Sequence, residues 1–511
     1  MNNPVCFRLM AFLPQFFSGQ MLAQVFDRSE LSAKLDIPWE IQYGSDKRLW
    51  ISQSGGRIVR VNPLNGASKI MFTAPDYFNG SPKESSTLCF KPKIGAGTLG
   101  MALHPNFKDS GVIFLVYSYN HQTLDSPQTR FKIAKLRWDK QLDTVVFEKT
   151  LVNDLPNGYD HLGGRLICVS QNKKHYLYYS AGDNGISETS EPLCYSPQSS
   201  NPNNFAQDIQ HKNGKIHRFN LDGSIPADNP VDGNSVFTRG HRNPQGLAWN
   251  PRSGLVYCAE HGDRTDDEIN LLKSGKNYGW KQVRGYHSDN NFSGEAQFVS
   301  SYAPDPKIKG DSLMEPLFSW CNVPQPLTNK YTDWCTVAPS DLLYYNANAI
   351  KNWKNSLLVV TLKKSETLKQ CVYRFQLQDN GEHLSAAQPN PELLFEQDFL
   401  LNGRLRDLTF DTEGENLYTI NNGGTDRDKI ICYKLVKDKL LILPNPAATE
   451  VEIKTEKIIS QTDIFSENGQ LVSSFAGNSR LYNITNLTPG LYFVKVTTTD
   501  AKILSQKLLR L

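Results

Sequence analysis

The stretch LWISQSGGRIVRV (residues 49–61) contains two alternating apolar runs separated by a turn with two glycines. This arrangement is typical of an antiparallel β-hairpin. Five further pairs follow along the chain: VIFLVYSY with FKIAKLRW from Val112, YLYYSAGDNG with GKIHRFNLDG from Tyr176, LVYCAEHG with EINLL from Leu255, LLVVTLK with CVYRFQL from Leu357, and NLYTINNGG with IICYKLV from Asn416. Because Tyr, Phe, Val and Ile dominate these runs and long helical periodicity is rare, an all-β fold is predicted.

The recurrence of these pairs indicates how the strands are arranged. Units of about 70 residues are longer than common propeller repeats, yet radial repetition of four-stranded blades accommodates them best. We therefore predict a six-bladed β-propeller over residues 25–438. A single large β-sandwich is the rival architecture, and it does not explain six similar units.

The composition changes in residues 439–511, the C-terminal end of the chain. Short alternating strands there are separated by turns at Asn468 and Gly469 and at Pro489 and Gly490, a pattern that predicts a small, separate β-sandwich domain. This segment carries no cluster of His, Cys or carboxylate side chains. We therefore expect the chemistry to reside in the propeller.

Composition narrows the classes of function. The formal net charge is only +3 over 511 residues, and no long run of Lys and Arg occurs, so nucleic acid is not an expected partner. No uninterrupted apolar stretch approaches the ~20 residues that a membrane-spanning helix needs, so the protein is predicted not to span a membrane. Small-molecule chemistry is the expectation that remains.

Residues 1–24 read as an irregular signal peptide, with one cation at Arg8, an apolar run broken by Pro14, and small residues near Ala23. A disordered or mis-assigned start is the alternative. Removal of this segment leaves eight cysteines, of which Cys321 and Cys335 are the best candidate pair because they flank a proline-containing loop. Buried reduced thiols are the competing interpretation.

One short unit, TRGHRNPQGLAWNPRSGLVYCAEHGDRTDDEINLLKSGKNYGW (residues 238–280), combines an Arg-Asn pair, a strand and an acidic turn, which is typical of a ligand site. Arg242 and Asn243 lie in a loop shaped by glycine and proline, where they suit an anionic ligand. Three more cations suit a ligand with several carboxylates, namely Lys363, Arg404 and Arg406. For each of them alone, scattered surface charge is the simpler explanation. Calcium prefers the oxygen ligands that Gly262, Asp263 and the acidic turn at 266–268 offer, but such turns are often only solvated.

His161 follows Asp160 in the glycine-rich loop NGYDHLGGRLIC (residues 157–168). A histidine beside a carboxylate can act as a general base, and an ordinary surface histidine is the alternative. The chain has no GxGxxG before a helix and no P-loop, which disfavours nicotinamide and nucleotide cofactors. It also lacks the EF-hand pattern and the GxSxG of α/β-hydrolases.

With these segments the chain resembles the soluble family of pyrroloquinoline quinone (PQQ)-dependent glucose/sorbosone dehydrogenases, which are six-bladed propellers. The resemblance covers roughly residues 37–437 and is carried by FNLDGSIPADNP, GHRNPQGLA, DDEINLL and NYGW. It implies oxidation of an aldose at its anomeric carbon, with hydride transfer to PQQ and release of a lactone. The C-terminal segment, which begins at Pro444-Asn445-Pro446, resembles type IX secretion sorting domains of Bacteroidetes, with a generic adhesion or carbohydrate-binding sandwich as the alternative.

The resemblance also implies roles for individual residues. His161 is the expected base, with Asp160 beside it, and main-chain carbonyls of Gly262 and Asp263 are expected to hold a catalytic calcium ion. The residues expected to hold the quinone are Arg242, Asn243, Thr336, Lys363, Arg404 and Arg406. A second, structural calcium of the family falls on Glu268, Tyr278, Arg284 and Tyr286.

Three positions depart from the family pattern. Gly95 replaces a Gln that contacts the sugar in glucose-oxidising members, so substrate choice is expected to be relaxed or redirected. Asp263 replaces a Pro at the cofactor calcium, which keeps the carbonyl and adds a carboxylate. Ser288 replaces an Asp ligand of the second calcium, although Asp289 is adjacent, so this calcium site is in doubt.

The sequence thus predicts a quinoprotein sugar dehydrogenase that is exported through the periplasm and is secreted or held at the cell surface. Its expected partners are a sugar, PQQ, Ca²⁺ and an unidentified electron acceptor, and a homodimer is one assembly open to it. A non-catalytic cell-surface propeller that binds carbohydrate or protein is the alternative. A calcium-dependent lactonase is a third hypothesis, and it requires carboxylates that converge on a central metal.

Overall fold

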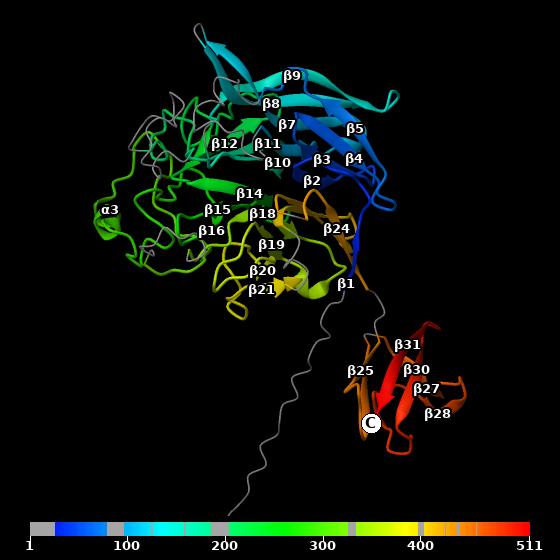
Figure 1. Ribbon diagram of the computed structural model, residues 1–511. Helices are drawn as coiled ribbons and strands as arrows, with labels where there is room; N and C mark the ends of the chain where they lie inside the picture. The colour runs from blue at the N-terminus through cyan, green and yellow to red at the C-terminus, as the bar shows by residue number, and fades with distance from the viewer. Residues whose placement is uncertain are drawn as a thin grey trace, which may run out of the picture. The chain divides into compact units, whose positions relative to one another are not determined.

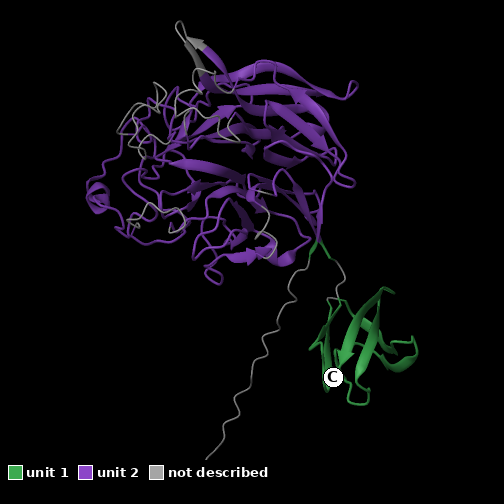
Figure 2. Cartoon of the chain, in the orientation of Figure 1, with its two compact units in different colours: residues 1–27, 435–511 green, residues 28–434 purple. Residues whose placement is uncertain are grey.

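The computed structural model describes residues 26–78, 97–123, 126–157, 160–184, 204–324, 334–396, 403–424, 426–436, 440–455 and 457–511. The chain divides into two compact units, which Figure 2 distinguishes by colour. One unit is Arg28–Lys434, and the other comprises Met1–Asp27 and Leu435–Leu511. No helix in these described ranges has the length and apolar character needed to cross a membrane.

The described residues of the larger unit form six four-stranded antiparallel sheets, whose strands are labelled in Figure 1. The first three sheets are β2–β5 (Pro38–Tyr43, Leu49–Gln53, Arg57–Val61, Ser68–Thr73), β6–β9 (Thr98–Leu103, Val112–Thr123, Ser126–Asp139, Thr144–Leu155) and β10–β13 (Gly163–Gln171, Lys174–Ala181, Lys215–Asn220, Val236–Arg239). The next two are β14–β17 (Asn243–Trp249, Val256–His261, Glu268–Leu272, Phe318–Ser319) and β18–β21 (Pro339–Tyr345, Ser356–Thr361, Val372–Gln376, Glu392–Leu394). The sixth is β22–β24 with β1 (Arg404–Phe410, Asn416–Asn422, Ile430–Leu435, Phe26–Glu30). Helical structure is limited to α2 (Phe107–Ser110), α3 (Glu295–Ser301) and the 3₁₀ turn Lys351–Trp353 within the described ranges.

The first strands of the six sheets form a ring. Each of β2, β6, β10, β14, β18 and β22 contacts the next one, and β22 contacts β2. We call these six the axial strands. The ring confirms the predicted all-β propeller, because radial sheets joined through their first strands define that architecture. The hairpin pairs predicted from sequence are the second and third strands of each sheet.

The ring is closed by strands from the two ends of the larger unit. Strand β1, near the N-terminus, pairs with β24 and completes the sheet that β22 begins. This pairing covers the edge of β24 and joins the last sheet to the start of the chain. The sequence analysis did not identify β1 as a strand of that sheet.

Apolar side chains pack between neighbouring sheets and hold the ring together. One buried cluster joins Phe114 of β7 with Leu166 of β10, Leu177 of β11 and Phe219 of β12. Complete burial of such side chains stabilises the fold by about 1.5–3 kcal/mol each. Strand β19 (SLLVVT) is buried along its whole length, which explains why its sequence is a continuous apolar run.

Every axial strand carries a bulge or irregularity in its pairing with the second strand of its sheet. The register shifts lie between Pro38 and Glu40, Thr98 and Met101, Gly163 and Leu166, Pro244 and Gly246, Pro339 and Asp341, and Leu405 and Asp407. A bulge bends its strand and re-aims a side chain, and such irregularities are common beside active sites. The six irregularities occur near corresponding places along the axial strands, which brings polar residues to the centre of the ring.

The smaller unit is a β-sandwich, as predicted. Its two sheets are β25-β26-β29 (Leu441–Leu443, Glu450–Lys454, Leu481–Asn483) and β28-β27-β30-β31 (Leu471–Ala476, Ile459–Ser466, Gly490–Thr498, Ile503–Arg510). Ile453, Ile464 and Val494 are among the buried side chains of a separate apolar core. This unit therefore has the core that an independent domain needs.

Candidate active site at the N-terminal ends of the axial strands

His161 lies in the loop before β10, with a positive φ of 47°. Its Nδ1 lies 2.8 Å from Oδ1 of Asp183, a carboxylate that is wholly buried. The indole of Trp280 and the amide of Asn204 donate hydrogen bonds of 2.7 and 2.8 Å to the other oxygen of Asp183. A carboxylate fixed in this way orients the imidazole and stabilises its protonated form.

Asp183, which the sequence analysis did not single out, is therefore a carboxylate that contacts the imidazole of His161. The side chain of Asp160 accepts a hydrogen bond of 3.0 Å from the backbone N–H of His161. Gly182 allows the close approach, because a Cβ there would lie 1.8 Å from the carbonyl oxygen of His161. The sequence did contain a signal for Asp183, namely a Gly-Asp turn directly after the buried strand β11.

Asn243 links the histidine loop to a second buried histidine. Its side-chain oxygen accepts from the backbone N–H of Gly163 (3.3 Å) and from the amide of Gln245 (2.8 Å), so its nitrogen is the donor to Nδ1 of His261 (3.2 Å). Nδ1 of a neutral His261 then accepts, and the hydrogen is assigned to Nε2. That nitrogen is buried and has no hydrogen-bond partner among the described residues.

Cations from distant parts of the sequence converge around His261. Burial lowers the pKa of His261 well below its usual value, and the positive charges of Arg242, His161, Arg406 and Arg404 lower it further. Arg406 is itself buried, and its pKa is lowered well below normal by burial and by neighbouring Arg404 and Arg165. Its Nε has no hydrogen-bond partner in the described structure. The predicted grouping of Arg242, Arg404 and Arg406 is thus present.

Lys363 is the fourth cation of this group, which we call the cationic pocket: Arg242, Lys363, Arg404 and Arg406. Burial lowers the pKa of Lys363, partly opposed by the charge of Asp267, and nearby Arg242 lowers it further. The backbone N–H of Lys363 donates to the carbonyl of Val337 (3.2 Å), next to the buried Thr336. The segments that carry Thr336 and Lys363 are therefore held side by side.

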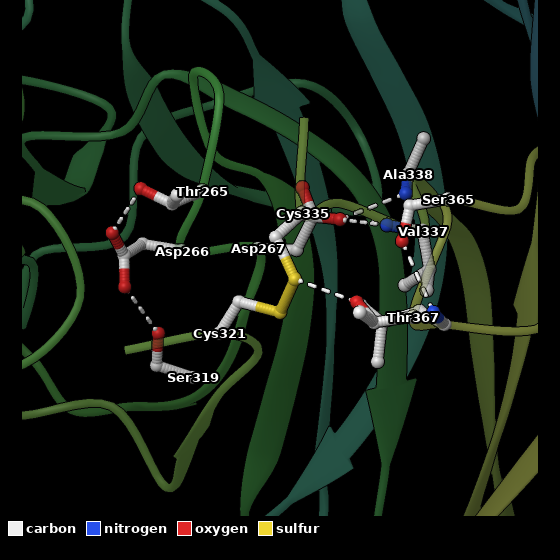
Figure 3. Close-up of a disulfide and its surroundings, with 11 residues drawn as sticks. Thr265, Asp266, Asp267, Ser319, Cys321, Cys335, Val337, Ala338, Ser365 and Thr367 are labelled. Carbon is white, nitrogen blue, oxygen red and sulfur yellow. Dashed lines mark hydrogen bonds between the residues drawn. A yellow bond between two sulfur atoms is a disulfide. The ribbon is translucent and has the colours of Figure 1, made fainter. Parts of the chain in front are cut away.

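The buried carboxylate of Asp267 joins two loops of the site. One oxygen accepts from the backbone N–H of Gly262 (2.9 Å), and the other accepts from those of Val337 (2.6 Å) and Ala338 (2.8 Å). The predicted disulfide between Cys321 and Cys335 is formed beside it, as Figure 3 shows. The loop of Gly262 is thus tied to the segment that precedes β18.

The other cysteines fall into two groups. Cys168, Cys258, Cys371 and Cys432 are unpaired thiols within the described structure. Cys89 and Cys194 lie outside the described residues, as do Cys6 and the whole predicted signal peptide. Gly95, the position expected to affect sugar choice, also lies outside them.

At the expected cofactor-calcium loop, Gly262 and Asp263 follow β15 directly. The carboxylate of Asp263 pairs with Arg284 at 2.7 Å. The Asp263 carboxylate, which stands where the family has a proline side chain, therefore forms an ion pair with the guanidinium of Arg284. The main-chain carbonyls remain the oxygen donors that suit a hard cation in this loop.

The residues expected for the second calcium are largely satisfied by protein contacts. Glu268 accepts from the backbone N–H of Gly285 and from the amide of Asn270 (both 2.9 Å), and burial and nearby Glu260 raise its pKa well above normal. The Tyr278 hydroxyl donates to the carbonyl of Leu271, and the Tyr286 hydroxyl accepts from the backbone N–H of Ser319 (3.3 Å). Ser288 supplies no carboxylate, and Asp289 accepts from the backbone N–H of Asn291 (2.9 Å).

No three His, Cys, Asp or Glu side chains of the described residues are grouped so that they could hold a metal. The second calcium at Glu268, Tyr278, Arg284 and Tyr286 stays a prediction, as does the lactonase hypothesis.

A cavity of about 440 Å³ opens beside the site. Trp280, Arg284, Phe292 and Asp263 are among its lining residues. Trp280 also donates to Asp183, and the Arg242 guanidinium lies 5.4 Å from the centre of its ring. Trp280 is therefore the residue that connects this cavity to Asp183 and Arg242, and the volume of the cavity suits a small-molecule ligand.

Comparison with known proteins agrees with this arrangement. Residues 35–431 match the family model described as Glucose / Sorbosone dehydrogenase, and residues 441–509 match that of the Secretion system C-terminal sorting domain. Quinoprotein glucose dehydrogenase B of Acinetobacter calcoaceticus is 30% identical over 450 residues, which cover 79% of this chain and 87% of that protein. Aldose sugar dehydrogenase YliI of Escherichia coli is 27% identical over 366 residues, which cover 70% and 83% respectively.

Solved structures show the same propeller fold. The PQQ-bound form of aldose sugar dehydrogenase from Streptomyces coelicolor has a TM-score of 0.55 and 21% identity, and the match covers 81% of this chain and 100% of that one. The apo-form of the soluble aldose sugar dehydrogenase from Escherichia coli has a TM-score of 0.55 and 24% identity, with 81% and 99% coverage. The sorting domain indicates export to the cell surface or the medium. The chain belongs to the glucose/sorbosone dehydrogenase family, joined here to a C-terminal secretion-system sorting domain.

Proposed function

We propose that the protein is an exported quinoprotein oxidoreductase that oxidises an aldose-type sugar at C1 to the lactone. PQQ is the proposed hydride acceptor, with Ca²⁺ bound to it. The observation that carries this proposal is the convergence of the His161–Asp183 pair with the four cations of the cationic pocket.

The unsatisfied donors of the pocket fit an anionic cofactor. Nε2 of His261 and Nε of Arg406 are buried and have no hydrogen-bond partner within the described structure. A buried donor without an acceptor costs about 1–3 kcal/mol, so an acceptor is expected to bind there. PQQ carries three carboxylates, which the two-pronged guanidinium groups and the ammonium of Lys363 are suited to bind. Asn243 and Thr336 are proposed to complete the set.

His161 is proposed to take the proton of the sugar hydroxyl at C1. Because Nδ1 is engaged by Asp183, the nitrogen assigned to this proton is Nε2. Asp183 stabilises the imidazolium that results, and Trp280 and Asn204 keep that carboxylate in place. When bound, PQQ supplies the electrophile that accepts the hydride from the sugar carbon.

Calcium is proposed to bind through the main-chain carbonyls of Gly262 and Asp263 together with the cofactor. The support is the fixed geometry of this loop, since Asp267 holds the N–H of Gly262 and Arg284 holds the Asp263 side chain. A calcium ion there would act as a Lewis acid on the quinone. The second calcium of the family is not part of the proposal.

The sugar itself is expected to differ from glucose or to be one of several aldoses. Gly95 cannot supply the side-chain hydrogen bonds of a Gln, and loss of a hydrogen-bonding group from a site changes substrate discrimination. We therefore expect Gly95→Gln to narrow the range of sugars oxidised. A change of kcat/KM ratios across an aldose panel would measure this.

The proposed activity is tested by steady-state turnover. Apo-protein is reconstituted with PQQ and Ca²⁺, and reduction of an electron-accepting dye is followed with a broad aldose panel. Turnover with at least one aldose, lost in His161→Ala, is the expected result. Sugar binding that survives His161→Ala and needs no quinone, without turnover for any sugar, would instead favour a non-catalytic carbohydrate-binding propeller.

A further inference from the structure

A buried cluster of charges lies on the axial strands next to the cationic pocket. Arg165 of β10 is its centre, and its guanidinium pairs with Glu40 of β2, with Asp407 of β22 at 3.0 Å and with Asp341 of β18 at 3.2 Å. All four side chains are at most 7% exposed. We call these four residues the axial cluster. It contains three carboxyl groups and one guanidinium.

The sequence of the axial strands places this cluster between the pocket and a second cavity. On β22, Arg406 of the pocket is followed by Asp407 of the cluster and then by Leu408, which lines the cavity. On β14, Gln245 lies two residues after Asn243, and its carbonyl accepts a hydrogen bond of 3.0 Å from the guanidinium of Arg165. This cavity, of about 330 Å³, is lined by residues from all six axial strands and includes Glu40, Asp341 and Asp407. The carboxyl groups therefore border a cavity whose lining does not include the cations of the cationic pocket.

Direct contacts couple the cluster to the cationic pocket. The ring of Trp39 lies 4.2 Å from the guanidinium carbon of Arg165 and 4.7 Å from that of Arg406. Asp407 and Asp341 act electrostatically on Arg406, favouring its charged form. The pocket cations and the cluster carboxylates therefore share one electrostatic environment, in which charges interact more strongly than in water.

We propose that binding of an anionic quinone to the cationic pocket is coupled to uptake of a proton by the axial cluster. The bound carboxylates add negative potential at Glu40 and Asp341, which favours the neutral form of these two groups. The proton compensates the charge of the ligand. This coupling rests on the proposed function, because it requires that the pocket binds PQQ.

Glu40 is the group best placed to take the proton near neutral pH. Burial raises its pKa to about 8, with the charge of Asp407 adding to the rise and that of Arg165 opposing it. The groups facing it are Arg165 from β10, Asp407 from β22 and Gln42 from its own strand. Burial also raises the pKa of Asp341 well above normal, so Asp341 is the second candidate.

The number of protons taken up on quinone binding follows from the raised pKa of Glu40. If ligand binding raises the pKa of Glu40 from about 8 to about 9, the protonated fraction rises by roughly 0.5 at pH 8.5 and by only about 0.1 at pH 7. By linkage, the Kd for the quinone weakens as the pH rises through this range, by at most about tenfold for a one-unit shift. The pKa of His261 lies far lower, so its titration falls outside this window.

The test is isothermal titration calorimetry of calcium-loaded apo-protein with PQQ, at pH 7 and pH 8.5. Two buffers of different ionisation enthalpy are used at each pH, so that the number of protons taken up is measured directly. Wild type is expected to take up roughly 0.5 proton at pH 8.5 and about 0.1 at pH 7. Glu40→Gln is expected to remove most of the uptake at pH 8.5 while quinone still binds.

Glu148→Gln is the matched control, because Glu148 lies on the outer strand β9, away from the axial strands. There it forms ion pairs with Lys135 and Arg137. This substitution should leave proton uptake unchanged. Asp341→Asn is the second test variant if Glu40→Gln does not fold, and it should also reduce uptake. Binding without proton uptake in wild type, or undiminished uptake in Glu40→Gln, overturns the coupling alone. Absence of any quinone binding overturns both the coupling and the proposed function.

Discussion

Arg406 and Asp407 are neighbours on β22, but their side chains belong to two differently built regions. Asp407 of the axial cluster accepts from Arg165 (3.0 Å) and from the backbone N–H groups of Ile41 and Leu408 (both 2.7 Å). Arg406 of the cationic pocket is buried with its Nε unpartnered among the described residues. The hydrogen bonds of Asp407 are thus made within the protein, whereas Arg406 keeps a donor for a ligand. The difference indicates which region supports the fold and which one the ligand completes.

The comparison predicts the largest loss of stability for Arg165→Met. This change leaves three buried carboxyl groups without their guanidinium, and removal of one partner from a buried ion pair costs about 3–5 kcal/mol. Urea unfolding measures the effect. Arg404→Met, at an exposed position of the pocket, is the control and should change stability by less than about 0.5 kcal/mol. Equal losses in the two variants would remove the distinction between cluster and pocket.

The histidine–aspartate pair gives the next largest effect, on activity. Asp183→Asn is expected to lower kcat by about 100-fold or more, because the amide no longer stabilises the imidazolium of His161. Asp160→Asn is the comparison variant and should lower kcat less, since the Asp160 side chain accepts from the backbone N–H of His161 (3.0 Å) and the side-chain oxygen of Asn can accept the same hydrogen bond. Steady-state kinetics with a saturating sugar measures both. A larger loss in Asp160→Asn would reverse the assignment.

Arg406→Met should separate stability from ligand binding. The change removes a buried charge whose pKa is lowered well below normal by burial and by Arg404 and Arg165, so the apo-protein is expected to become more stable. The same change should weaken quinone binding about tenfold, the effect of one lost charged contact of about 1.4 kcal/mol. Thermal unfolding of the apo-protein and quinone titration measure the two effects. A destabilised apo-protein would show that Arg406 is a structural residue like Arg165.

The smallest effect concerns the pH dependence of stability. Because the pKa of Glu40 is raised to about 8, the folded state holds a proton that the unfolded state releases above about pH 4.5. Glu40 therefore makes the protein less stable as the pH rises toward 8, by at most about 1.4 kcal/mol per pH unit. Glu40→Gln should flatten this part of the profile, as measured by urea unfolding at pH 5, 6 and 7. Parallel profiles for the two proteins would contradict the raised pKa.

The sequence predicted much of the fold because hairpin patterns are local. Alternating apolar runs and their turns identified two strands in each of the six sheets. Strand β1 was missed because its partner β24 lies at the far end of the propeller sequence. The register irregularities of the axial strands were also missed, since they arise from pairing between strands and leave no short motif.

Some charged residues of the site were predicted from the sequence and others were missed, again because only local patterns can be recognised. Arg242, Arg404 and Arg406 stand in recognisable loops and strand starts, and the structure brings them together around His261. The axial cluster joins Arg165 to Glu40 and Asp407, which lie 125 and 242 positions away in the sequence on other strands. Such a cluster forms only when the ring closes, so its members cannot be paired from local patterns.

Optical titration of the apo-protein with PQQ in the presence of Ca²⁺ tests the central claim most directly. The account predicts a saturable spectral change, weakened in Arg406→Met and retained in the control Glu148→Gln. A linear, unsaturable change, or identical curves for wild type and Arg406→Met, would contradict the assignment of the cationic pocket as a quinone site.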